Sequence, residues 1–144
     1  MPTILRNILS VIFGLVAGSV VNMSLVMLGP SVIPPPPGVD LTTAEGLAKG
    51  MPLLEAKHFV FPFLAHALGT LAGALVAFLV AGSRNTVFAF AVGGFFLAGG
   101  IAAAFMIPAP AWFIGLDLVA AYIPMAWLGT VIGRRLHGTR GTTP

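Results

Sequence analysis

Residues 59–81 read FVFPFLAHALGTLAGALVAFLVA, an apolar stretch that contains one histidine, His66, and no lysine, arginine or carboxylate side chain. A helix needs about 20 apolar residues to cross the hydrocarbon core of a bilayer. A helix also satisfies its own backbone hydrogen bonds in lipid, which an open strand cannot do. The stretch therefore predicts a membrane-spanning helix with a polar group inside it.

The composition extends this prediction to the whole chain. Of the 144 residues, 58% are hydrophobic and 8% are charged, whereas about 25% are charged in a typical soluble domain. We therefore predict an integral membrane protein whose first partner is the lipid bilayer. The basic residues flank apolar segments and form no patch, which argues against a nucleic-acid partner. The chain has no cysteine, which excludes disulfides and thiolate metal sites, and we predict no metal or other cofactor.

Four apolar segments are long enough to span a membrane. They cover residues 4–28, 59–81, 87–107 and 112–133. The fold class predicted is all-α, an integral membrane four-helix bundle forming one domain over residues 1–144, with an outer loop at 29–58 and a tail at 134–144. A cleaved signal peptide is the alternative for the first segment. Its apolar stretch is longer than the roughly 7–15 residues of a typical signal, so we retain it as a helix.

The arginines predict how the spans are oriented. They precede the first helix, lie in the turn between the second and third, and follow the fourth: Arg6, Arg84, Arg134, Arg135 and Arg140. With four spans these places share one side, and an excess of lysine and arginine marks the cytoplasmic side. The sequence therefore predicts a multi-pass protein of a bacterial inner (cytoplasmic) membrane with both termini cytoplasmic.

The outer loop is predicted to be structured. Its four prolines, residues 34–37, favour a stiff polyproline II segment because each ring fixes φ. Thr42 and Glu45 have the spacing of a capping box, in which the Thr42 hydroxyl accepts from the backbone N–H of Glu45. A short interfacial helix from Thr43 to Lys49, ending at Gly50, should follow. This loop is either a plain spacer or a functional lid.

Small residues at helical spacing predict how the helices pack. Lipid gives helices no hydrophobic reason to associate, so close approach through glycine matters more. Three predicted helices carry glycines four residues apart: Gly14 and Gly18, Gly69 and Gly73, Gly129 and Gly133. Small residues in every helix indicate a closely packed bundle, and they also suit a homo-oligomer or a larger membrane complex.

The polar residues inside the spans indicate a candidate site. From a rise of about 1.5 Å per residue, Asn22, His66 and Asp117 all lie roughly 8–10 Å from the outer end of their helices. Each shares a helix face with small residues, since residues four apart lie on one face. All three should therefore point into the bundle, with Thr70 and Tyr122 nearby. Pro124 also frees the carbonyl of residue 120, which adds an acceptor.

Two interpretations of these residues stay open. Ionisable groups inside a membrane usually pair or line a cavity, so His66 and Asp117 are expected to contact each other, with Asn22 completing the hydrogen bonding. The leading hypothesis is a small transport or ligand-binding module with a proton or ligand site open to the outer side. The alternative is an accessory or assembly subunit of a larger complex in which these residues are structural. No motif argues for enzymatic activity, and no catalytic residue is assigned.

Three stretches carry a resemblance: VIPPPPG (32–38), KHFVFPFLAHALGTLAGA (57–74) and PAPAWFIGLDLVAAYIPMAWLG (108–129). The chain resembles an uncharacterised family of small bacterial membrane proteins with four predicted transmembrane helices. The resemblance covers nearly the whole chain and includes His66 and Asp117. It implies the structural class and a bacterial source, and it implies no activity.

The orientation can be tested with reporter fusions. A reporter fused after Pro144 should read as cytoplasmic, because the arginines fall on one side of the four spans. A reporter inserted at Gly38 should read as external. A cytoplasmic signal at Gly38, or an external one after Pro144, would overturn the assignment.

Overall fold

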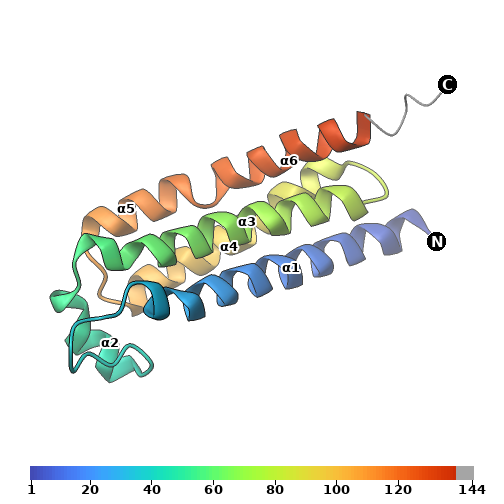
Figure 1. The fold of residues 1–144 in the computed structure, drawn as a ribbon. Helices are drawn as coiled ribbons and strands as arrows, with labels where there is room; N and C mark the ends of the chain where they lie inside the picture. Colours follow the sequence, from blue (N-terminus) through green and yellow to red (C-terminus); the bar gives the residue numbers. More distant parts are fainter. Residues whose placement is uncertain (139–144) are drawn as a thin grey trace.

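In the computed structural model of the protein, residues 1–138 are described, and within them the chain forms helices and no strand (Figure 1). The elements are α1 (Thr3–Val32), α2 (Ala44–Gly50), the 3-10 helices η1 (Met51–Leu53) and η2 (Ala56–Phe59), α3 (Val60–Val80), α4 (Asn85–Met106), α5 (Ala111–Ala120) and α6 (Ile123–Gly138). Arg140 and the rest of the predicted tail beyond Gly138 lie outside the described residues.

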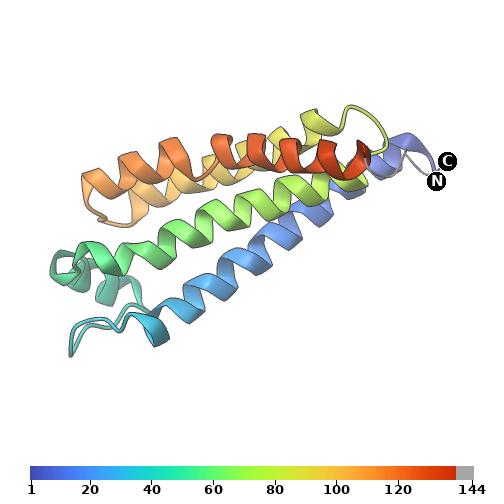
Figure 2. The same cartoon turned by 45° about the horizontal axis from the view of Figure 1, so that its top comes forward.

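Four stretches are long and apolar enough to span a membrane, which indicates a multi-pass membrane protein. They are Thr3–Val32, Ala56–Val80, Asn85–Met106 and Ala111–Gly138. The N-terminus and the end of α6 lie at one end of the molecule and the α1–α3 connection lies at the other, as expected for four spans (Figures 1 and 2). We name these the inner and the outer end after the predicted orientation, which stays a prediction.

The first span is longer than predicted. We expected it to end near residue 28, but α1 continues through Pro30 to Val32. A proline inside a helix removes one hydrogen bond, here to the carbonyl of Val26, and the helix can continue where the following groups still pair. The N–H of Ile33 does so, donating to the Gly29 carbonyl at 2.8 Å.

The fourth span is interrupted, where one continuous helix over residues 112–133 was predicted. α5 ends at Ala120 and α6 begins at Ile123. Pro124 has no N–H for the carbonyl of Ala120, and proline is well tolerated in the first turn of a new helix. The chain therefore restarts its helix at the proline, and Tyr122 lies in the break.

α3 is the central helix of the molecule. The share of buried residues is 44% in the most apolar part of its span and 11% to 28% in the other three. Its buried residues are mainly small, namely Ala65, Ala67, Gly69, Thr70, Gly73, Ala74, Ala77 and Phe78. Small side chains on several faces let α1, α4 and α6 all pack against this one helix.

The closest packing joins α1 and α3 through reciprocal glycine pairs. A Cβ added at Gly18 would lie 2.7 Å from the carbonyl oxygen of Gly69, and one added at Gly69 would lie 2.9 Å from that of Gly18. Gly14 and Gly73 face each other in the same way, with 2.7 Å in both directions. The two helices run antiparallel (Figure 2), so the two glycine rows meet in opposite order.

Glycines also set the approach of α6 to α3. A Cβ at Gly129 would lie 3.2 Å from both the Ala74 side chain and the Leu71 carbonyl oxygen, and one at Gly133 would collide with the Phe78 ring. α4 meets α6 where Gly93 faces the methyl group of Ala126. The six predicted packing glycines therefore all lie at helix contacts, and the inner half of the molecule is tightly packed.

Polar groups of α1 close the inner end of α3. The Arg6 guanidinium donates to the carbonyls of Val80 and Ala81 at 3.2–3.4 Å. The Asn7 side chain accepts from the N–H groups of Gly82 and Ser83 at 2.9 and 3.2 Å. A cation at the C-terminal end of a helix also interacts favourably with the helix dipole. Arg6 thus has a structural contact in addition to its value as an orientation signal.

The cap of the outer helix differs from the prediction by one residue. The Thr43 side chain, not Thr42, caps α2 by accepting from the N–H of Gly46 at 3.0 Å. Thr42 instead donates its hydroxyl and its N–H to Asp40 at 2.6 and 2.8 Å. These two bonds hold the pKa of the Asp40 carboxyl below its usual value. Because the Thr42 hydroxyl is hydrogen-bonded to Asp40, the next residue, Thr43, is the N-cap of α2.

The proline run ends in a turn. The N–H of Val39 donates to the Pro36 carbonyl at 3.1 Å, and Gly38 has φ +83°. Proline followed by a glycine with positive φ is the signature of a type II turn. The polyproline II conformation of residues 34–37 stays a prediction.

Substitution of a packing glycine should destabilise the fold. Gly18→Leu places a side chain against both the Gly69 carbonyl and the Phe96 ring, so it should lower the free energy of unfolding by about 1–3 kcal/mol. Thermal unfolding in detergent measures the effect. Gly99→Leu is the matched control, because a Cβ there meets nothing within 4 Å. Equal unfolding temperatures for the two variants would contradict the glycine packing.

Candidate functional site

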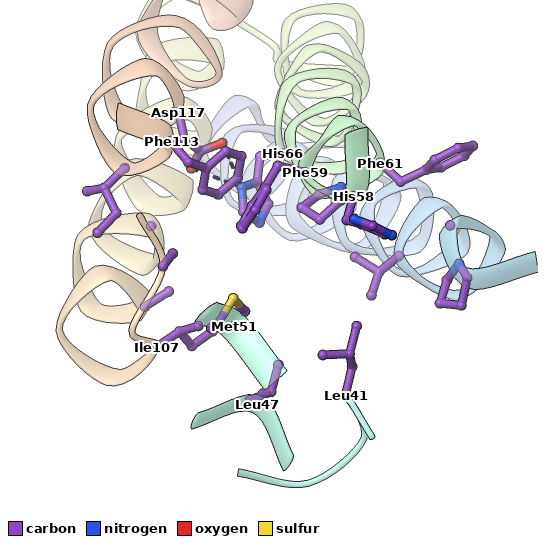
Figure 3. Close-up of a pocket in the computed structure, with 18 of the residues that line it drawn as sticks. Leu41, Leu47, Met51, His58, Phe59, Phe61, His66, Ile107, Phe113 and Asp117 are labelled. Atoms are coloured by element: carbon purple, nitrogen blue, oxygen red, sulfur yellow. Dashed lines mark hydrogen bonds and ion pairs between the residues drawn. The ribbon is translucent and has the colours of Figure 1, made fainter. Parts of the chain in front are cut away.

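His66 on α3 and Asp117 on α5 contact each other directly (Figure 3). The imidazole Nδ1 lies 2.9 Å from Oδ1 and 3.0 Å from Oδ2 of the carboxylate. The Asp117 side chain is only 7% exposed, and that of His66 is 27% exposed. The imidazole therefore stands between the carboxylate and open space, and the contact expected from the depth of these residues is present.

Tyr122 completes the cluster from the break between α5 and α6. Its hydroxyl donates to Asp117 Oδ2 at 2.9 Å, and its ring stacks on the His66 ring with centroids 5.9 Å apart. A Cβ added at Gly100 on α4 would collide with this ring and its hydroxyl. The site thus depends on a helix break that positions the tyrosine and on a glycine that leaves room for it.

The inner side of the cluster is closed by apolar packing. Ala67, Ala121 and Tyr122 are buried together, with partly buried Phe63, Phe96, Leu97, Leu118 and Met125 packed against them. Ala121 is 0% exposed, so α5 and α6 approach α3 closely at this level. A charged carboxylate in such surroundings is stable only when its hydrogen bonds are made within the protein. Asp117 has two donors, one from His66 and one from Tyr122.

This arrangement fixes the role of each imidazole nitrogen. An ionised Asp117 can only accept hydrogen bonds, so Nδ1 of His66 must carry its proton. Within residues 1–138 the Nε2 atom of His66 has no hydrogen-bond partner. Nε2 can accept a hydrogen bond when the ring is neutral and donate one when it is protonated. Nε2 of His66 is therefore the one atom of the pair that can either accept or donate a hydrogen bond to a further group.

A cavity of about 610 Å³ reaches the pair from the outer end of the molecule (Figure 3). It lies between the outer ends of α1, α3, α4 and α5 and the outer loop. Its lining is apolar apart from Thr42, His58, His66 and Asp117. A volume of this size is in the range of roughly 300–1,000 Å³ that small-molecule sites occupy.

The outer loop forms one wall of this cavity. Leu41, Leu47 and Met51 line the side opposite the pair (Figure 3). His58 ties the loop to the start of α3: its Nδ1 accepts from the Glu55 N–H at 3.0 Å, and its Nε2 donates to the Pro34 carbonyl at 3.1 Å. The loop therefore covers the cavity, as a lid would.

Asn22 and Thr70 do not join the pair. No hydrogen bond links Asn22 to His66 or Asp117 in the described part of the chain, so the expectation that it completes their hydrogen bonding is not met. Its Cβ instead lies 3.0 Å from where a Cβ at Gly69 would be, because α1 and α5 contact different sides of α3. Thr70 is 1% exposed, and its hydroxyl has no hydrogen-bond partner among residues 1–138.

Several residues of the site had no signal in the sequence. One is the part of the cavity wall that the outer loop forms. Another is the aromatic pair of Phe59 and Phe113, with ring centroids 4.8 Å apart. Both depend on contacts between segments that are distant in the sequence. The spacing of Glu55 and His58 did carry a signal, since the two residues cap η2 reciprocally. The described residues contain no group of three or more potential metal ligands.

No family model, curated protein or solved structure matches this chain.

Removing the side chain of His66 or Asp117 should lower the free energy of unfolding more than replacing the Asp117 carboxylate by a neutral amide. His66→Ala or Asp117→Ala leaves a desolvated partner, so each should lower the free energy of unfolding by about 1–3 kcal/mol. Asp117→Asn keeps an acceptor for the Tyr122 hydroxyl and loses the charge, so its loss should be smaller.

A double-mutant cycle measures the coupling. The double alanine variant should be less destabilised than the sum of the single variants by about 0.5–3 kcal/mol. The control cycle combines Asp117→Ala with His137→Ala, because His137 lies at the far end of α6, where its ring is tilted against Phe78 with centroids 5.6 Å apart. Strict additivity of the two single variants would mean that His66 and Asp117 are not coupled.

Proposed function

We propose that this protein is a small ligand-binding or transport module of a bacterial inner membrane, with both termini cytoplasmic and its ligand site at His66 and Asp117. The observation that carries the proposal is the cavity of about 610 Å³ that ends on this pair. A helical bundle whose polar residues were purely structural would need no open volume beside them.

The chemistry of the pair supports binding. Most of the cavity lining is apolar, with a few polar groups among it, which is the usual composition of a small-molecule site. Asp117 holds the imidazole in one orientation, and Nε2 of His66 is left to contact a ligand. His58 also lines the cavity, but both of its ring nitrogens are hydrogen-bonded within the loop.

The two halves of the molecule differ in a way that bears on transport. The inner half is closed by the glycine contacts of α1, α3 and α6, and the cavity opens only in the outer half. In this conformation a ligand would reach the pair through the cavity and not through the glycine contacts. Transport would require the inner contacts to separate, whereas binding alone requires no such change.

A second candidate function is an accessory or assembly subunit of a larger membrane complex. It is favoured by a row of small residues on α4, namely Ala91, Gly94, Ala98 and Ala102. Ala91, Ala98 and Ala102 are exposed, and a Cβ at Gly94 would meet nothing within 4 Å. Such rows allow another helix to approach closely. In this case His66 and Asp117 would hold helices together.

One experiment separates the two candidates. The protein is extracted from its native membrane into polymer-bounded lipid discs, and copurifying small molecules and proteins are identified by mass spectrometry. Ile114→Trp fills the cavity, since Ile114 lines it. Leu116→Trp is the matched control on the same helix, because Leu116 is 49% exposed. A bound small molecule should fall at least about tenfold in the first variant, a loss of about 1.4 kcal/mol or more, and stay constant in the second.

The result decides between ligand site and subunit. A small molecule retained equally by both tryptophan variants, or none in any sample, would contradict the ligand site. A protein that copurifies with the wild type and is lost in Ala98→Leu, while no small molecule depends on Ile114, would establish the subunit role instead.

A further inference from the structure

The lining of the cavity limits the charge of its ligand, an inference that rests on the proposed ligand site. Among the described residues that line it, none is lysine or arginine, and Asp117 is the only carboxylate. An anionic headgroup at the inner end would meet that carboxylate in a medium of low dielectric constant, where like charges repel strongly. Fatty acids and phosphate esters are therefore poor ligands for this site.

A cationic headgroup is also disfavoured. Both carboxylate oxygens of Asp117 already lie within 3.0 Å of a donor, and the side chain is 7% exposed. An ammonium group would have to share the carboxylate oxygens with His66 and Tyr122, on a side chain that is only 7% exposed. The group that faces the cavity is the imidazole, which offers hydrogen bonding in place of an exposed negative charge.

The free Nε2 atom of His66 suits two related neutral groups. With the ring neutral, Nε2 accepts a hydrogen bond from a hydroxyl group. With the ring protonated, Nε2–H donates to a carbonyl oxygen, and Asp117 balances the imidazolium charge. A single site can therefore hold the carbonyl and the hydroxyl form of one molecule.

Access to the cavity is from the lipid. On the aqueous side Leu41, Leu47 and Met51 cover it. On the lipid side α1 and α4 separate toward their outer ends (Figure 2). Met27 of α1 and Ala104 of α4 line the cavity there, and Met27 is 71% exposed. This side of the cavity, lined by Met27 and Ala104, is called the opening between α1 and α4, and a ligand from the outer leaflet would enter there.

We propose that the cavity binds a neutral, membrane-soluble molecule of the quinone and quinol class, with its ring oxygen hydrogen-bonded to His66 Nε2 and its apolar tail leaving between α1 and α4. Phe59 and Phe113 line the cavity beside His66, where they present aromatic surface to the ring (Figure 3). The proposal concerns binding and requires no electron transfer.

The chain provides an optical probe of this site. Trp112 makes edge contacts with Phe59 and Phe113, with ring centroids 5.5 and 5.9 Å apart, and both phenylalanines line the cavity. A bound benzoquinone ring should quench its fluorescence. Trp127, the other tryptophan, is 58% exposed on α6 and is removed as Trp127→Phe. All measurements use the full chain in lipid nanodiscs.

The experiment titrates a benzoquinone with a decyl tail, and then uses its quinol, decanoate and decylammonium as competitors. Quenching should saturate, and the quinol should compete while the two charged amphiphiles should not. His66→Ala should weaken quinone binding at least about tenfold, corresponding to about 1.4 kcal/mol, and His137→Ala should leave it unchanged.

A second pair of variants leaves the histidine and the carboxylate in place. Ala104→Phe blocks the opening between α1 and α4 and should reduce quenching as strongly as His66→Ala. Ala102→Phe, on the exposed face of α4, should not. If His66→Ala fails to fold, this pair alone decides the outcome.

The outcomes separate this inference from the proposed function. Quinone quenching that is equal in wild type, His66→Ala and Ala104→Phe would reflect partition into lipid and would overturn the inference. A change in Trp112 fluorescence on addition of decylammonium or decanoate that depends on His66, without saturable quinone quenching, would replace the ligand class and keep the ligand site. Failure of every probe, together with no copurifying small molecule, would remove both.

Discussion

The buried carboxylate of Asp117 is the constraint on which the outer half of the structure depends. A charge inside an apolar helix assembly is costly unless hydrogen bonds within the protein compensate it. His66 provides one donor and Tyr122 the other. Tyr122 reaches the carboxylate because Pro124 interrupts the fourth span, and its ring fits because Gly100 has no side chain. A helix break and a glycine that look like defects in isolation thus serve one buried charge.

The inner half of the structure is stabilised differently, by the close approach of helix backbones. Gly14 and Gly18 of α1 meet Gly73 and Gly69 of α3. Dispersion forces and helix contact replace the hydrophobic effect there, because lipid tails are as apolar as the side chains. Toward the outer end the glycine pairs give way to a contact between Gly29 of α1 and the Phe61 side chain of α3, and α1 diverges from α4 (Figure 2). The cavity therefore lies where backbone-to-backbone glycine pairs no longer hold the helices together.

Much of this could be predicted from the sequence because helices have a fixed rise and period. Those two numbers place His66 and Asp117 at one depth and on inward faces, and they identify the glycine rows. They do not say which neighbour a helix face meets, so the sequence did not show that Asn22 lies beside Gly69 without a hydrogen bond to the pair. They also do not predict which of two competing hydrogen bonds forms. The Thr42 hydroxyl donates to Asp40, and Thr43 caps α2 in its place. The cavity has no signal in the sequence, since it arises from the space left between four helices and a loop.

The length of α1 couples the site to the bilayer itself. Its 30 residues span about 45 Å, whereas the hydrocarbon core is about 30 Å thick. α4, with 22 residues, is about 33 Å long and matches the core closely. A helix longer than the core accommodates the mismatch by tilting. Because Gly14 and Gly18 hold the inner part of α1 against α3, a change in bilayer thickness should mainly move the outer end of α1, which lines the cavity.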